Sequence, residues 1–173
     1  KVLTEQLNDY IKCQTIANYI IVLESQLDLI KFLDQKILYP VYQDLKQNIT
    51  KVKAQKSQKE IDNGLRWGTY SVQFFVTFVH YFVSRDIEPK QALLEAYKEI
   101  LNPHHNSIVR ALFSSAFKLL PTHKEQFYKN LQLEAGQETI EHFVQFKSAV
   151  ETAAQHILKG KLVTETESQE SNE

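Results

Sequence analysis

The sequence predicts an all-α protein, and three observations support this. Only four Gly and four Pro occur in 173 residues, which favours long uninterrupted helices over a many-turned β fold. Apolar residues recur at helical spacing along most of the chain. The apolar share of 43% and the aromatic share of 11% are ordinary for a globular protein, and the length fits one domain with a sizeable core.

The first three helices are expected from their apolar stripes. A short helix is expected at 2–13, followed by a helix at 17–33 whose stripe comprises Ile20, Leu23, Leu27 and Ile30. A third helix is expected to start at Pro40, because proline is tolerated in a first helical turn. It runs to about Gln55, with an inward stripe of Val41, Leu45, Ile49 and Val52.

The segment 55–63 (QKSQKEIDN) is polar and is expected to be a loop. The next element, 65–83, contains VQFFVTFVHYFV, whose β-branched and aromatic residues could suggest a strand. Its length and its apolar character on all sides favour a buried helix instead. Helices at 89–101 and 103–120 each begin with a proline, which suits the first helical position.

The remaining elements are two further helices, at 123–131 and 137–159. Seven or eight helices are thus expected in one domain, residues 1–160. The polar, acidic segment 161–173 is expected to be a disordered tail.

Several classes of function find no support in the composition. Twenty Lys and Arg against twenty-one Asp and Glu give no argument for nucleic-acid binding. The one cysteine, Cys13, forms no internal disulfide, and no zinc-ligand spacing occurs. No leader pattern and no long apolar run is present, so we expect a soluble protein. Without a catalytic triad pattern or a phosphate-binding glycine loop, we expect neither an enzyme nor a metal or other cofactor.

Three polar residues share one face of the helix predicted at 40–55. Asp44, Asn48 and Lys51 follow each other at offsets of four and three. Such a face is most often a solvated surface. The three side chains nevertheless flank the buried stripe, and an acceptor, an amide and a cation together can bind several hydroxyl groups, as sugars present them.

Two further features admit an ordinary and a functional interpretation. Trp67 could be a core residue or a flat platform for a ligand ring, which Gly64 and Gly68 beside it would leave accessible. His104 and His105 could be a surface or capping pair, or could supply a neutral imidazole that hydrogen-bonds a ligand carbonyl or amide. A metal site is not favoured, because adjacent helical side chains point about 100° apart.

Taken together, these segments resemble the glycolipid transfer protein family. FLDQKILYPVYQDLKQNITKVKA resembles the family segment in which Asp, Asn and Lys face the lipid headgroup. LRWGTYSVQFF is similar to the family's Trp-led helix, QALLEAYKEIL to the helix after it, and HHNSIVRALFSSAFKLLP to its His-led helix. The resemblance spans about residues 32–131.

The resemblance implies a two-layer helical sandwich that holds one lipid and works without nucleotide or metal. It assigns Asp44, Asn48, Lys51 and Trp67 to the sugar headgroup, and Asp44 with His105 to the ceramide amide. The hydrocarbon chains would lie in an apolar cavity between the layers, with candidate residues Phe74, Phe78, Ile108, Phe113 and Phe117. The expected function is transfer or sensing of a glycosphingolipid by a monomeric, cytoplasmic protein that contacts membranes transiently.

The sequence departs from the family pattern in three places. The path from Lys51 to Trp67 is too short for the further helix that the family has there, Ser107 stands where the family often has a membrane-contacting Trp, and the C-terminal tail has no aromatic residue to close over the site. Two alternatives stay open: transfer of ceramide-1-phosphate, as in a sister branch of the family, and a helical protein-interaction module that transfers no lipid. Because Trp67 is kept and Arg66 is the only cation that could join Lys51, a sugar is favoured over a phosphate.

Overall fold

The computed structural model describes residues 15–32, 35–85, 87–117, 124–125 and 137–159. Six helices lie in these ranges, and no strand does. They are α2 (Ile16–Phe32), α3 (Gln35–Ala54), α4 (Gln58–Ser84), α5 (Pro89–Ile100), α6 (Ser107–Phe117) and α8 (Gln137–Leu158). The helices predicted at 2–13 and, apart from residues 124–125, at 123–131 lie outside the described residues, as does the predicted tail.

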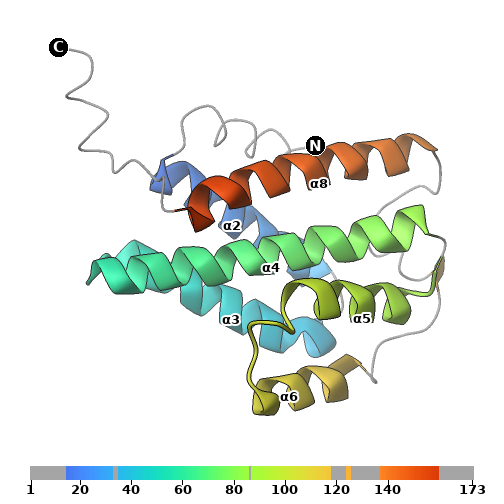
Figure 1. Cartoon of the computed structure of the whole chain (residues 1–173), viewed down its shortest axis with the longest axis horizontal. Helices are drawn as coiled ribbons and strands as arrows, with labels where there is room; N and C mark the ends of the chain where they lie inside the picture. The colour runs from blue at the N-terminus through green and yellow to red at the C-terminus, as the bar shows by residue number, and fades with distance from the viewer. Residues whose placement is uncertain (1–14, 33–34, 86, 118–123, 126–136, 160–173) are drawn as a thin grey trace.

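The helices form two layers around α4. This helix packs against α8 on one side, against α5 on another and against α3, while α2 packs on α3. In Figure 1, α8, α4 and α5 follow one another from top to bottom, in front of α2 and α3. The predicted all-α, two-layer architecture is therefore confirmed.

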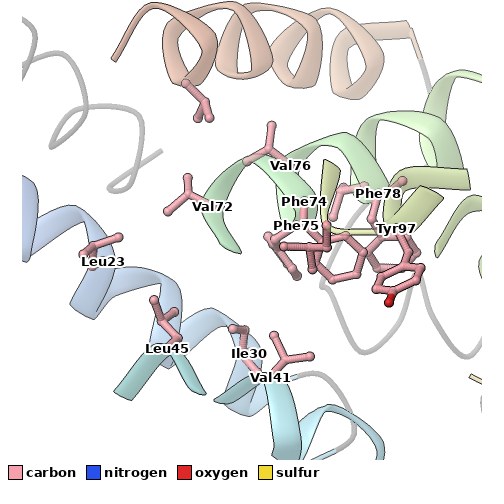
Figure 2. Close-up of a cluster of buried hydrophobic side chains, with 14 of the residues drawn as sticks. Leu23, Ile30, Val41, Leu45, Val72, Phe74, Phe75, Val76, Phe78 and Tyr97 are labelled. Atoms are coloured by element: carbon pink, nitrogen blue, oxygen red, sulfur yellow. The ribbon is translucent and has the colours of Figure 1, made fainter. Parts of the chain in front are cut away.

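The core lies where the two layers meet. Figure 2 shows Leu23, Ile30, Val41 and Leu45 of α2 and α3 on one side and the aromatic side chains of α4 and α5 on the other. The α3 stripe expected from the sequence is buried throughout, with Leu45 and Val52 at 0% exposure. At about 25 cal/mol per Å² of apolar surface, this burial is the main stabilising term of the fold.

Three predicted boundaries are wrong, and each has a physical reason. α3 begins at Gln35 rather than Pro40, since proline near a helix start removes only one backbone hydrogen bond. The loop expected at 55–63 shrinks to residues 55–57, because the Ser57 hydroxyl accepts from the Glu60 N–H at 3.3 Å and caps α4. α6 begins at Ser107 rather than Pro103, because the Asn106 side chain caps it by accepting from the Val109 N–H at 3.0 Å.

Two properties of the described residues bear on function. None of the described helices combines the length and the apolar character that a membrane crossing needs. The described ranges also contain no group of three or more His, Cys, Asp or Glu side chains that could hold a metal ion.

Candidate functional site

The polar residues of α3 lie at the border between core and solvent. Asn48 is only 2% exposed, whereas Asp44 and Lys51 are exposed residues. The Asn48 amide donates a hydrogen bond from Nδ2 to Asp44 Oδ2 at 3.1 Å. This bond orients the carboxylate and leaves its other lone pairs for a ligand. A purely solvated face, the ordinary interpretation of this pattern, does not describe Asn48.

A tight connection sets α4 antiparallel to α3. Three residues, 55–57, join the helices, and Gln55 turns the chain with a φ of 46°. At Gly64 the helices are so close that an added Cβ would lie 2.8 Å from the Asn48 carbonyl oxygen and 2.6 Å from Val52 Cγ2. Likewise, a Cβ at Gly68 would lie 2.9 Å from Leu23 Cδ1. Both glycines therefore permit close helix packing, and the indole of Trp67 beside them is partly exposed in the pocket.

The two adjacent histidines stack on two aromatic side chains of α4. His104 and His105 lie in the turn that follows α5. The His105 ring stacks on Trp67, with centroids 5.4 Å apart and an interplanar angle of 22°. The His104 ring stacks on Tyr70 at 4.0 Å and 10°. The turn is thus held against α4, with His105 beside the indole.

These elements enclose a pocket of about 240 Å³. α3 provides a polar wall, and Trp67, His105 and Phe113 form an aromatic wall opposite it. The lining residues are Val41, Asp44, Asn48, Lys51, Asn63, Trp67, Ser71, Leu101, His105, Val109 and Phe113. The structure therefore brings together all five residues that the sequence assigned to headgroup and amide binding, despite the short path from Lys51 to Trp67.

Burial shifts the protonation of two groups in this pocket. The pKa of Asp44 is raised, because partial burial of its carboxyl group outweighs the opposing effects of Lys51 and of the Asn48 hydrogen bond. The pKa of His105 is lowered, first by burial and then by the positive charges of His104 and Arg110. His105 is therefore neutral at pH 7, with one nitrogen as donor and the other as acceptor.

A tyrosine outside the pocket fixes the orientation of His105. The Tyr97 hydroxyl lies 3.2 Å from His105 Nδ1. Tyr97 is only 5% exposed, and its ring stacks on Phe113 with centroids 5.1 Å apart. Because burial also raises the pKa of Tyr97, its hydroxyl stays protonated and can donate to Nδ1. The imidazole then carries its proton on Nε2.

The residues expected to line an apolar cavity are divided between three environments. Phe113 lines the pocket. Phe74, Phe78 and Phe117 are 1%, 2% and 2% exposed and pack in the core formed by the described residues. Ile108 is 72% exposed and does not line the pocket. The next residue, Val109, lines the pocket instead.

Sequence reasoning missed three polar residues that line or support this site. Asn63 was assigned to a loop, Ser71 was not singled out, and Tyr97 acts through His105. Asn63, Trp67 and Ser71 follow each other at steps of four, which is the signal that could have placed them on one helix face. Nothing in the sequence alone indicates the contact of Tyr97 with His105.

Comparisons with known proteins identify the fold of this chain. The family model "Glycolipid transfer protein (GLTP)" matches residues 53–133, from the end of α3 to beyond α6. No curated protein matches the sequence significantly. Among solved structures, the fungal glycolipid transfer protein HET-C2 matches with a TM-score of 0.71 and 21% identity, covering 86% of this chain and 84% of that chain.

Two further structures have the same fold. The GLTP-fold of FAPP2, a protein described as selecting simple glycosphingolipids, matches with a TM-score of 0.58 and 19% identity over 84% of this chain and 80% of that chain. The apo form of mouse ceramide-1-phosphate transfer protein matches with a TM-score of 0.65 and 14% identity over 92% of this chain and 94% of that chain. The chain thus has the glycolipid transfer protein fold, and its resemblance to the glycolipid transfer protein family is confirmed.

Proposed function

We propose that this protein binds one glycolipid, with its sugar in the pocket between α3 and α4, and carries it between membranes. One observation carries the proposal: Asp44, Asn48 and Lys51 of α3, Trp67 of α4 and His105 of the turn after α5 line one pocket. The matches to the GLTP family model and to the fungal glycolipid transfer protein HET-C2 support the same conclusion.

The pocket supplies a complementary partner for each polar part of a glycosylceramide. Asp44, Asn48 and Lys51 offer an acceptor, an amide and a cation to sugar hydroxyls, and Trp67 offers an apolar ring face. The ceramide amide needs an acceptor for its N–H and a donor for its C=O. Asp44 and the Nε2–H of His105 would supply this pair.

The charges of the pocket favour a sugar over a phosphate. Among the described residues that line it, Lys51 is the one permanent cation, and His105 is neutral at pH 7. The Asp44 carboxylate would repel a phosphate group at short range. Ceramide-1-phosphate therefore remains the second candidate.

Contact with a membrane is part of the proposal. Ile108 and Leu112 are 72% and 65% exposed on successive turns of α6, the helix whose Val109 and Phe113 line the pocket. Large apolar side chains exposed beside a ligand site are typical of an interaction surface. Docking through this edge would bring the pocket close to the lipid layer.

Fluorescence of Trp67, the only tryptophan, together with lipid transfer between vesicles, tests the function. Vesicles with glucosylceramide should shift and quench the emission and serve as transfer donors, whereas vesicles with ceramide-1-phosphate should not. Asp44→Val should abolish transfer while leaving helix content and melting nearly unchanged. A response to ceramide-1-phosphate alone would favour that ligand, and no response to any lipid would favour a protein-interaction module.

A further inference from the structure

The hydroxyl group of Ser71 lies at the pocket, and no described residue forms a hydrogen bond with it. Ser71 is only 4% exposed, yet it lines the pocket on α4, one turn beyond Trp67. The Oγ atom is not fully buried and faces the space of the pocket, where a ligand can reach it. A hydrogen-bonding group of a ligand would satisfy it.

The backbone that carries Ser71 is held by α2. Gln26, which is 1% exposed, donates from Nε2 to the backbone carbonyl oxygen of Ser71 at 2.9 Å. This buried bond ties α2 to the turn of α4 that carries Ser71. The Gln26 Oε1 atom is itself buried and has no partner among the described residues. The Ser71 hydroxyl is therefore presented by a rigid part of the fold.

The order of residues along the two helices shows which part of a lipid would reach Ser71. In order along the pocket, α3 contributes Lys51, Asn48, Asp44 and Val41, and the antiparallel α4 contributes Asn63, Trp67 and Ser71. A sugar on Trp67 and an amide between Asp44 and His105 would place the first carbon atoms of the hydrocarbon chains at the next turn. Ser71 is the polar group on that turn, and Val41 faces it from α3.

We propose that the Ser71 hydroxyl binds a hydroxyl group on carbon 2 of the acyl chain, so that 2-hydroxyacyl glycosylceramides are the preferred ligands. This carbon is bonded directly to the amide carbonyl that His105 would hold. A serine hydroxyl can donate and accept, so it pairs with a lipid hydroxyl in either direction. A plain acyl chain would leave Ser71 unpaired in a dry environment. The inference rests on the proposed glycolipid binding and specifies the lipid class.

Binding of two lipids that differ by one oxygen atom tests the inference. Trp67 fluorescence is titrated with vesicles that contain glucosylceramide with a 2-hydroxyacyl chain or with a plain acyl chain of the same length. The wild-type protein should prefer the hydroxylated lipid about fivefold, the effect of one net hydrogen bond. Ser71→Ala should remove this preference by weakening binding of the hydroxylated lipid only.

Two controls separate a lost contact from a damaged fold. Ser84→Ala removes an exposed hydroxyl of α4 that bonds the His80 carbonyl of its own helix, and it should keep the preference. Ser71→Ala should melt no lower than wild type, because it removes an unpaired polar group and introduces a better helix former. Equal binding of the two lipids by wild type, or a preference that survives Ser71→Ala, overturns the inference and leaves the proposed function intact. If neither lipid binds, both fall.

Discussion

The neighbours of the His105 ring determine its protonation. Trp67, Tyr97 and Phe113 surround it, with ring centroids 5.0–5.7 Å away, and burial lowers its pKa. In a neutral imidazole, the nitrogen that accepts a hydrogen bond leaves the proton on the other nitrogen. When the Tyr97 hydroxyl donates to Nδ1, the proton of the ring is on Nε2, which is then the donor left for a ligand carbonyl.

Removal of the Tyr97 hydroxyl should change the tautomer of His105 without disturbing the fold. In Tyr97→Phe, the ring that stacks on Phe113 is retained, so the melting temperature should change little. The ¹⁵N chemical shifts of His105 should move from the Nε2–H form towards a mixture of both tautomers. Glycolipid binding should weaken about fivefold, as expected for one hydrogen bond. An unchanged tautomer in this variant would show that Tyr97 does not orient the ring.

The raised pKa of Asp44 predicts how binding depends on pH. The carboxylate accepts hydrogen bonds only when it is ionised, and burial makes it take up a proton at higher pH than an ordinary aspartate of pKa about 3.9. Glycolipid binding should therefore decline as the pH falls through this raised pKa. Asp44→Asn should bind weakly at neutral pH and should lack the decline. A wild-type curve that is flat down to about pH 4 would contradict this role.

The same shift predicts the stability of that variant. A carboxyl group whose pKa is higher in the folded than in the unfolded state binds its proton more tightly when folded. The protonated carboxyl group therefore stabilises the fold at low pH, and this stabilisation is lost as the pH rises from the unfolded-state pKa through the folded-state pKa. At pH 7 Asp44 is ionised and does not stabilise the unliganded protein. Asp44→Asn should melt at the same or a higher temperature there. Thermal unfolding without lipid measures this separately from binding.

At the scale of elements, local signals explain which boundaries could be predicted. The stripes of α2 and α3 repeat over several turns, so their existence follows from the sequence. The start of α4 was missed, although Ser57 and Glu60 have the spacing of a capping box. The polar character of 55–63 predicts a loop, whereas residues from Gln58 onward form the solvent-facing first part of a long helix.

The same distinction applies to the site. Asp44, Asn48 and Lys51 lie on one helix, so helical periodicity alone places them on one face. That Asn48 is buried, and that Tyr97 reaches His105, depends on contacts between helices that no local spacing encodes. The roles of Gly64 and Gly68 also depend on contacts between helices. Gly64 lies close to α3, and Gly68 lies close to α2.

The contact between α3 and α4 at Gly64 should be sensitive to a single methyl group. In Gly64→Ala, the new Cβ would meet the Asn48 carbonyl oxygen at 2.8 Å, and backbone atoms cannot move aside cheaply. Overpacking of this kind costs about 1–3 kcal/mol, against a gain of about 1 kcal/mol in helix propensity. We expect a lower melting temperature and weaker glycolipid binding, since Asn48 shifts with its backbone.

Lys59→Ala is the matched control for this change. It introduces alanine at an exposed position near the start of the same helix and creates no contact with α3. Its melting temperature and its lipid binding should equal those of wild type. If Gly64→Ala were as stable as this control, the close approach of the two helices would not depend on glycine.

At the scale of the whole molecule, the closed core limits what the protein can hold. The pocket of about 240 Å³ is smaller than the roughly 300–1,000 Å³ of typical ligand sites, and the aromatic side chains behind it are packed. Two long hydrocarbon chains therefore require the layers to move apart between α3 and α4. Burial of each methylene contributes about 0.8 kcal/mol, which can offset the cost of opening the core.

A small void at Phe74 should reveal where the chains enter. Phe74→Leu shortens a side chain that is 1% exposed, three residues beyond Ser71, and should cost about 1–3 kcal/mol of stability. A hydrocarbon chain that fills this void would restore part of the loss, because a ligand that binds only the folded state stabilises it. The rise in melting temperature on adding long-chain glycosylceramide should thus be larger for this variant than for wild type.

Val76→Ala is the control. It opens the core on the opposite side of α4, towards α8 in Figure 2, and its rise in melting temperature should be no larger than that of wild type. Equal rises in all three proteins would mean that the chains do not pass between α3 and α4.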